Sequence, residues 1–78
     1  MNLFCIKCRT TGDIHVGGFA TREEAKPERD HLNCLYYKNK EVKGNAVEYP
    51  FKGKQVKVPL QNREYWVART HNHRLGKS

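Results

Sequence analysis

Apolar and polar residues alternate with a period of two in several short stretches of this chain, a pattern typical of half-buried β-strands. Near the start, residues 3–8 and 14–19 are separated by Thr10-Thr11-Gly12-Asp13, whose composition indicates a turn. We therefore expect these two stretches to form a small hairpin.

Three further strands are indicated in the second half of the chain. Alternation runs over residues 47–51, 56–60 and 64–70, and the last of these is the clearest. Pro50 and Pro59 restrict the first two to sheet edges, because proline cannot donate to a strand ladder. We expect two or three antiparallel strands in a meander packed on the N-terminal part of the chain.

One helix is expected between the hairpin and the meander. Thr21-Arg22-Glu23-Glu24 matches the capping box, which starts a helical turn near Arg22. Pro27 follows too soon for an unbroken helix, so either the helix is kinked there or a short turn precedes a helix whose first residue is Pro27. The second alternative is favoured because proline suits the first helical position, and this helix would end near Tyr37. The predicted fold class is α+β.

All three cysteines fall in two short pieces that could hold a metal ion. Cys5 and Cys8 have two residues between them, as do His31 and Cys34, and 22 residues separate the two pairs. Zn²⁺ in structural sites prefers four thiolate or imidazole ligands in a tetrahedron. The spacing predicts a structural zinc site with the ligands Cys5, Cys8, His31 and Cys34.

Several alternatives to zinc stay open. Reduced cysteines can pack as small apolar residues, whereas a redox pair or a disulfide framework fits the position and the odd number of cysteines poorly. His15, His71 and His73 compete with His31 as the fourth ligand, but only His31 stands in register with a cysteine.

The order of these features resembles the treble-clef class of small zinc modules, or zinc-ribbon-like modules more broadly. A cysteine pair comes first, a hairpin follows, and a helix carries the second ligand pair. The similarity covers about residues 3–37 and is one of spacing and order. The resemblance implies a knuckle at Cys5 and Cys8 and a helix that presents His31 and Cys34. Two features depart from it: His31 lies late in the predicted helix, and Arg9 stands where a glycine often follows the knuckle.

Charge divides the 78 residues into two parts. Residues 1–37 hold five cations and five acids, whereas residues 38–78 hold ten cations and three acids, so the formal charge of +7 lies in the second part. We expect a single domain made of a zinc module (1–37), a basic β meander (38–70) and a flexible basic tail (71–78). The absence of a signal peptide or long apolar run, together with reduced cysteines, favours a monomer in the cytoplasm.

A basic half with interleaved aromatic residues favours a polyanionic partner. The predicted function is low-specificity binding of RNA or single-stranded DNA, and the residues expected to bind are Lys52, Lys54, Lys57, Arg63, Tyr65, Trp66 and Arg69. The alternative is a protein-interaction module, of the kind used by viral or phage modulators, that docks on an acidic surface of a transcription or translation assembly. No catalytic motif is readable, and His71-Asn72-His73 has the letters of an HNH nuclease without its spacing, so we expect no enzyme and no small-molecule substrate.

Overall fold

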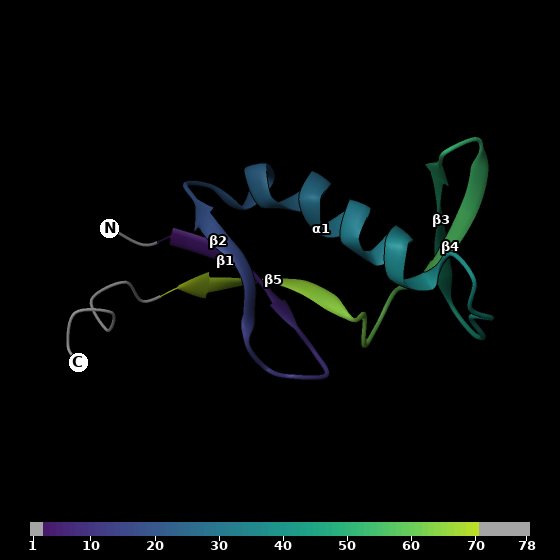
Figure 1. Ribbon diagram of the computed structural model, residues 1–78, viewed down its shortest axis with the longest axis horizontal. Helices are drawn as coiled ribbons and strands as arrows, with labels where there is room; N and C mark the ends of the chain where they lie inside the picture. Colours follow the sequence, from purple (N-terminus) through teal and green to yellow (C-terminus); the bar gives the residue numbers. More distant parts are fainter. Residues whose placement is uncertain (1–2, 71–78) are drawn as a thin grey trace.

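The structure is a computed structural model that describes residues 3–70, and the predictions made for His71, His73 and the tail lie outside these residues. One helix and five strands form two antiparallel sheets, which confirms the α+β class (Figure 1). In chain order the elements are β1 (Leu3–Cys8), β2 (Ile14–Phe19), α1 (Arg22–Tyr37), β3 (Ala46–Phe51), β4 (Lys54–Pro59) and β5 (Tyr65–Thr70).

The larger sheet has the order β2-β1-β5, with β1 in the centre. The predicted hairpin of residues 3–8 and 14–19 is confirmed. The expectation that the third C-terminal strand continues a meander is wrong, because β5 leaves β4 and pairs with β1 from Leu3↔Thr70 to Cys8↔Tyr65. The first and last strands of the described chain are therefore neighbours.

The smaller sheet is the two-stranded hairpin of β3 and β4. Lys52 (φ 53°) and Gly53 (φ 80°) connect the strands, and positive φ at both residues is the mark of the type I′ turn that suits the twist of a hairpin. Pro50 and Pro59 are tolerated because a two-stranded sheet consists of edges only.

Helix α1 begins at Arg22 and runs through Pro27, so the prediction that it starts at Pro27 is wrong. The Glu24 amide donates to Thr21 Oγ1 (3.1 Å), and the Ala20 amide donates to Glu24 Oε1 (3.0 Å), so the capping box holds the first turn. Ala25, fully buried, anchors this turn within the fold. Capping and burial together offset the hydrogen bond that Pro27 cannot make.

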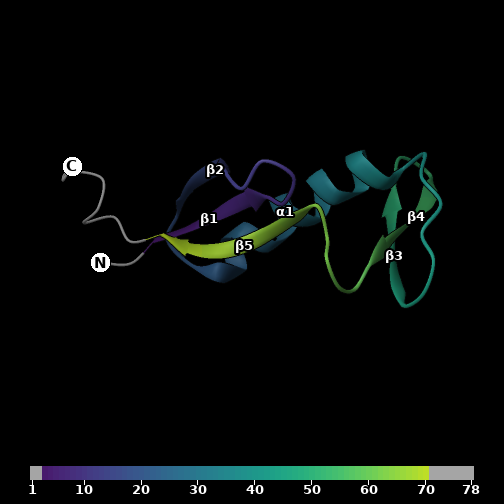
Figure 2. The same ribbon diagram turned by 90° about the horizontal axis from the view of Figure 1, so that it is seen from below.

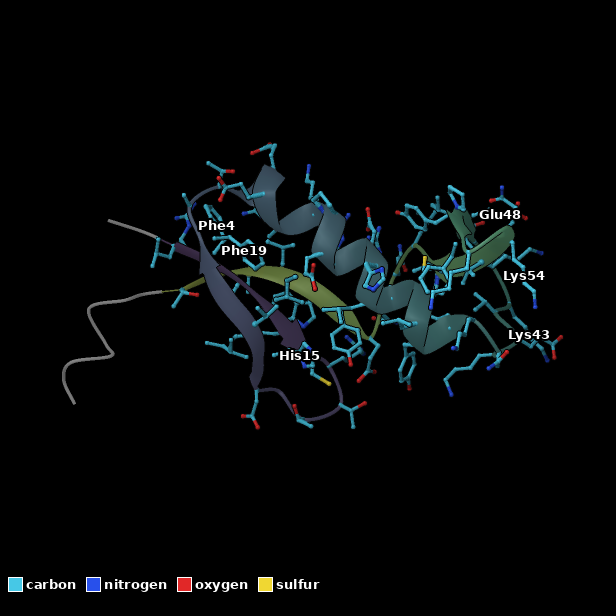
Figure 3. The ribbon with its side chains drawn as sticks, turned by 45° about the horizontal axis from the view of Figure 1, so that its top comes forward. Phe4, His15, Phe19, Lys43, Glu48 and Lys54 are labelled. Atoms are coloured by element: carbon cyan, nitrogen blue, oxygen red, sulfur yellow. The ribbon has the colours of Figure 1, made fainter. Side chains whose placement is uncertain are left out.

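The helix packs against both sheets (Figures 1 and 2). Ile6 and Ala25 are buried in the larger unit, whereas Cys34 packs with Val56 and Val58 of the hairpin at the other end of the helix. Figure 3 shows this separation, with Phe4 and Phe19 near one end of the helix and Lys54 near the other. Within the described residues, no helix is long and apolar enough to cross a membrane.

Candidate nucleic-acid interface

Cys5 and Cys8, the first predicted ligand pair, lie in strand β1, which pairs with β5 in continuous register, and not in a turn. Side chains three positions apart on a strand point to opposite faces of the sheet. Cys5 is buried opposite Ala68, whereas Cys8 is half-buried opposite Tyr65. The knuckle implied by the treble-clef resemblance is therefore not formed at these residues.

The second predicted pair lies on α1, where its two members face different surroundings. Cys34 packs with the hairpin residues Val56 and Val58. Burial, followed by the charge of Asp30, raises the pKa of the Cys34 thiol, which disfavours the thiolate that a metal needs. His31 is exposed, with its ring 5.5 Å from that of Phe51.

Among residues 3–70, no group of three or more His, Cys, Asp or Glu side chains converges in a way that could hold a metal ion. The arrangement therefore does not bring Cys5, Cys8, His31 and Cys34 to one centre, and a zinc staple is not supported by the fold. Zinc binding stays a prediction from the sequence. The competing ligand His15 lies on β2 with its ring 5.1 Å from that of Tyr65.

Cys8 instead takes part in a hydrogen-bonded cluster around Glu64. Cys8 Sγ donates to Glu64 Oε2 (2.9 Å), and the carboxylate also accepts from the hydroxyl (3.0 Å) and the amide (3.3 Å) of Thr10. Burial alone would raise the pKa of Glu64, but these hydrogen bonds and the charge of Arg9 outweigh it and lower the pKa. The cluster fastens the end of β1 to the start of β5.

The residues predicted to bind nucleic acid separate into two groups in the structure. Lys52, Lys54 and Lys57 lie on the β3–β4 hairpin, and Lys52 and Lys54 border a hollow of about 240 Å³ together with Lys38. Arg63, Trp66 and Arg69 lie on β5 or just before it. The single surface expected from the sequence is thus two surfaces, one at each end of the helix.

A wider groove lies beside β5, and four arginines line it. It has a volume of about 440 Å³, and its lining is formed by Arg9, Arg22, Arg29, Leu60, Asn62, Arg63, Trp66 and Val67. We call it the arginine groove. No acidic residue lines it, and the only ion pair among the described residues joins Arg29 to Asp30 (2.8 Å) beside it. Asp30 therefore offsets the charge of Arg29, and Arg9, Arg22 and Arg63 leave the lining with a net positive charge.

Three different elements position these arginines. Arg22 and Arg29 lie two helical turns apart on one side of α1, where the Arg22 guanidinium rests 5.0 Å from the Phe4 ring. Arg9 follows β1, and its amide donates to the Glu64 carbonyl (2.7 Å). Arg63 Nε donates weakly to the Leu60 carbonyl (3.4 Å). The guanidiniums are therefore held around the groove by the fold.

Trp66 supplies the aromatic surface of the groove. Its side chain is 44% exposed, and Lys7 Nζ lies 5.8 Å from the indole centroid. Tyr65 does not share this surface, because its ring packs near His15 and lies 6.4 Å from that of Tyr36. Burial, first of all, raises the pKa of Tyr65, in keeping with its covered position. Trp66 is thus the aromatic residue of β5 that can meet a ligand.

Sequence reasoning found Arg63 and Trp66 but missed Arg9, Arg22 and Arg29, since these three lie in the electrically neutral half of the chain. One signal was present: Arg22 and Arg29 are seven residues apart and share a helical face once the helix starts before Pro27. Arg69, which was predicted to bind, lies 5.9 Å from the Phe4 ring and does not line the groove.

Comparison of the chain with protein-family models, with curated proteins and with solved structures gave no match.

Proposed function

We propose that this protein binds RNA or single-stranded DNA with little sequence preference, and that the arginine groove is the principal contact. The observation that supports this best is the groove itself, in which four guanidiniums surround an exposed indole with no acid in the lining. Guanidiniums pair with phosphates, and an indole offers a stacking surface for any base. The proposal does not depend on zinc.

The lysines of the β3–β4 hairpin would add a second, weaker contact with phosphates. Lys54 and Lys57 are exposed, and Lys52 Nζ lies 5.4 Å from the Phe51 ring. Exposed lysines without a stacking partner contribute mainly through charge. This end of the molecule would therefore extend the footprint without selecting a sequence.

A salt titration of binding tests the proposal. Neutralising about four phosphates on a single strand should give a slope of about −3 in a plot of log K against log salt concentration. Absence of binding at low salt would overturn the proposal and leave the protein-interaction module as the better explanation. A tight complex with little salt dependence on an acidic protein would point the same way.

A pair of charge variants locates the contact. The double variant Arg22→Gln/Arg63→Gln removes two groove cations, and its salt slope should be shallower by about 1.4 because each lost phosphate contact changes the slope by about 0.7. The matched control Lys40→Gln/Lys43→Gln removes the same charge outside both the groove lining and helix α1. Equal effects of the two double variants would show that overall charge, and not the groove, governs binding.

A further inference from the structure

The outer edge of β5 begins with an unusual hydrogen-bonding arrangement. Asn33, fully buried on α1, donates from Nδ2 to the Tyr65 carbonyl (3.0 Å) and accepts at Oδ1 from the Tyr65 amide (3.0 Å). One planar amide group thus bridges the N–H and the C=O of a single strand residue. The side chain takes the place that a neighbouring strand would occupy.

The next residue with the same orientation is Val67. Along an edge strand, the backbone N–H and C=O groups of successive residues point alternately toward the neighbouring strand and away from it. The backbone groups of Val67 and Arg69 therefore point outward, as those of Tyr65 do, whereas the backbone groups of Trp66 and Ala68 point toward β1. The bonds between the Arg9 amide and the Glu64 carbonyl and between the Cys8 amide and the Asp13 carbonyl fit this alternation. Within residues 3–70, no hydrogen-bond partner is found for the outward N–H and C=O of Val67.

Val67 also lines the arginine groove, next to the exposed indole of Trp66. Val67, whose outward N–H and C=O are open, therefore shares one groove with an exposed indole and four arginines. We propose that the Val67 peptide groups bind the Watson–Crick edge of an unpaired base that stacks on Trp66. This assignment rests on the proposed function and specifies its ligand as a single strand with accessible base edges.

Asn33 shows what chemistry fits such a pair. Its side chain presents an acceptor and a donor on adjacent atoms, and the Watson–Crick edge of every nucleobase contains the same combination. A carboxylate offers acceptors only and would leave the Val67 carbonyl without a donor. In a duplex the Watson–Crick edges are already hydrogen-bonded to the opposite strand, so they are not free to bind Val67. The site would therefore accept any unpaired base, in agreement with little sequence preference.

An extended peptide is the competing occupant of an open strand edge. The observations favour a base because only Val67 and Arg69 present outward groups, Asn33 closes the edge at Tyr65, and the groove supplies an indole. Strand addition normally draws its affinity from a longer row of backbone hydrogen bonds. The experiment below includes a peptide so that this occupant can be recognised.

The single tryptophan of the chain makes the test direct. Fluorescence of Trp66 is followed while octauridylate RNA is added, and the same titration is made with an octamer of N3-methyluridine. Both octamers can stack and should quench the indole, but the methylated one lacks the donor for the Val67 carbonyl. We expect it to bind about fivefold more weakly, the loss of one neutral hydrogen bond.

Two variants separate the backbone contact from packing. Val67→Pro removes the outward N–H at an edge position where proline is tolerated, whereas the control Val67→Ala shortens the side chain and keeps the N–H. We expect Val67→Pro to bind octauridylate about fivefold more weakly than Val67→Ala. Trp66→Leu should weaken binding about tenfold or more.

The possible results are distinguishable. In one result, the octamers bind with the expected salt slope, do not quench the indole, and bind the Val67→Pro and Val67→Ala variants equally well. That result would overturn this assignment and leave the proposed function standing. Equal affinity of the wild-type protein for the two octamers would overturn it too, and this comparison uses no variant. No binding of either octamer would overturn both proposals. An acidic octapeptide that binds more tightly than octauridylate and depends on the Val67 N–H would show that the edge accepts a strand.

Discussion

Glu64 connects the start of β5 to the end of β1 through its carboxylate and to the end of α1 through its backbone amide. Its carboxylate accepts hydrogen bonds from Cys8 and Thr10, and its own amide donates to the Tyr37 hydroxyl (3.1 Å). In Glu64→Gln, the side-chain N–H₂ group would face the donors of Cys8 and Thr10, so these hydrogen bonds are lost and the donors are left without an acceptor. We expect a loss of about 1–3 kcal/mol in the free energy of unfolding, measured by urea denaturation. Cys8→Ser, which keeps a donor, is the control and should cost less.

The same carboxylate makes stability depend on pH. Burial opposes ionisation of Glu64, but the hydrogen bonds from Cys8 and Thr10 and the charge of Arg9 bring its folded-state pKa below the ordinary carboxyl value. The stabilisation is therefore complete above the ordinary pKa and is lost as the pH falls through the lower folded-state pKa. Urea midpoints measured from neutral to acid pH should fall more steeply for the wild type than for Glu64→Gln. Parallel curves would contradict this.

Asn33 is the other residue whose polar group is essential to the fold. Both of its bonds to the Tyr65 backbone are buried, so Asn33→Ala would leave an N–H and a C=O without partners. We expect a loss of about 2–4 kcal/mol, since each unsatisfied buried group costs about 1–2 kcal/mol. Asn33→Asp loses the donor, buries a charge and should be no better. Thermal unfolding of both variants checks this, with exposed Asn39→Ala as the control.

At the scale of elements, helix α1 offers a test of how Pro27 is tolerated. Pro27 is exposed and lies inside the helix, where its missing N–H leaves the Glu23 carbonyl without its helical partner. Pro27→Ala restores that hydrogen bond and should stabilise the protein by about 1–2 kcal/mol, after allowance for the greater freedom of the unfolded chain. Chemical denaturation measures the change. A destabilised variant would show that the proline fits the helix without strain.

The strands themselves were predictable, because the apolar run at residues 3–6 and the alternation over 14–16, 47–51 and 64–70 mark stretches that are at least partly buried. Their partners were not. Pairing of β1 with β5 depends on contacts between the two ends of the chain, which a local pattern does not contain. The capping box at Thr21–Glu24 indicated the helix start that the structure has. The sequence prediction placed the start at Pro27 instead, because proline is favoured at the first helical position.

The predicted metal ligands show the same limit at the level of single residues. The C-x-x-C spacing is compatible with a turn that faces one ion and equally with a strand that separates the two thiols. The stretch around Cys5 and Cys8 is an almost continuous apolar run without alternation, and the fold places both cysteines in strand β1. Spacing alone could not decide between the two, because the decision depends on the pairing of β1 with two neighbours.

At the scale of the whole molecule, the three cysteines occupy three separate surroundings that hydrogen bonds and packing already satisfy. We therefore expect a chelator to leave the circular dichroism spectrum and the melting temperature unchanged. Native mass spectrometry before and after the chelator measures the metal content directly. A bound zinc ion, with unfolding on its removal, would show that the fold depends on a metal as the sequence predicted.

The charge of the molecule is distributed differently in space than in sequence. The arginine groove takes three of its four arginines from the neutral half of the chain, while the hairpin at the far end carries lysines of the basic half. Helix α1 joins the two regions (Figure 1). A count of charges along the chain therefore pointed to a basic surface but identified only one of the four arginines that line the groove.

The adjacency of β1 and β5 has a consequence for how the protein is made. Among the described strands, the central strand β1 is synthesised first and β5, which completes its sheet, is synthesised last, so both sides of β1 are paired only after β5 has emerged. A nascent chain halted before Glu64 would lack the Glu64 cluster, the Tyr65 backbone that bonds Asn33, and the side of the arginine groove formed by Trp66 and Val67. Completion of the larger sheet and formation of the groove are thus a single event.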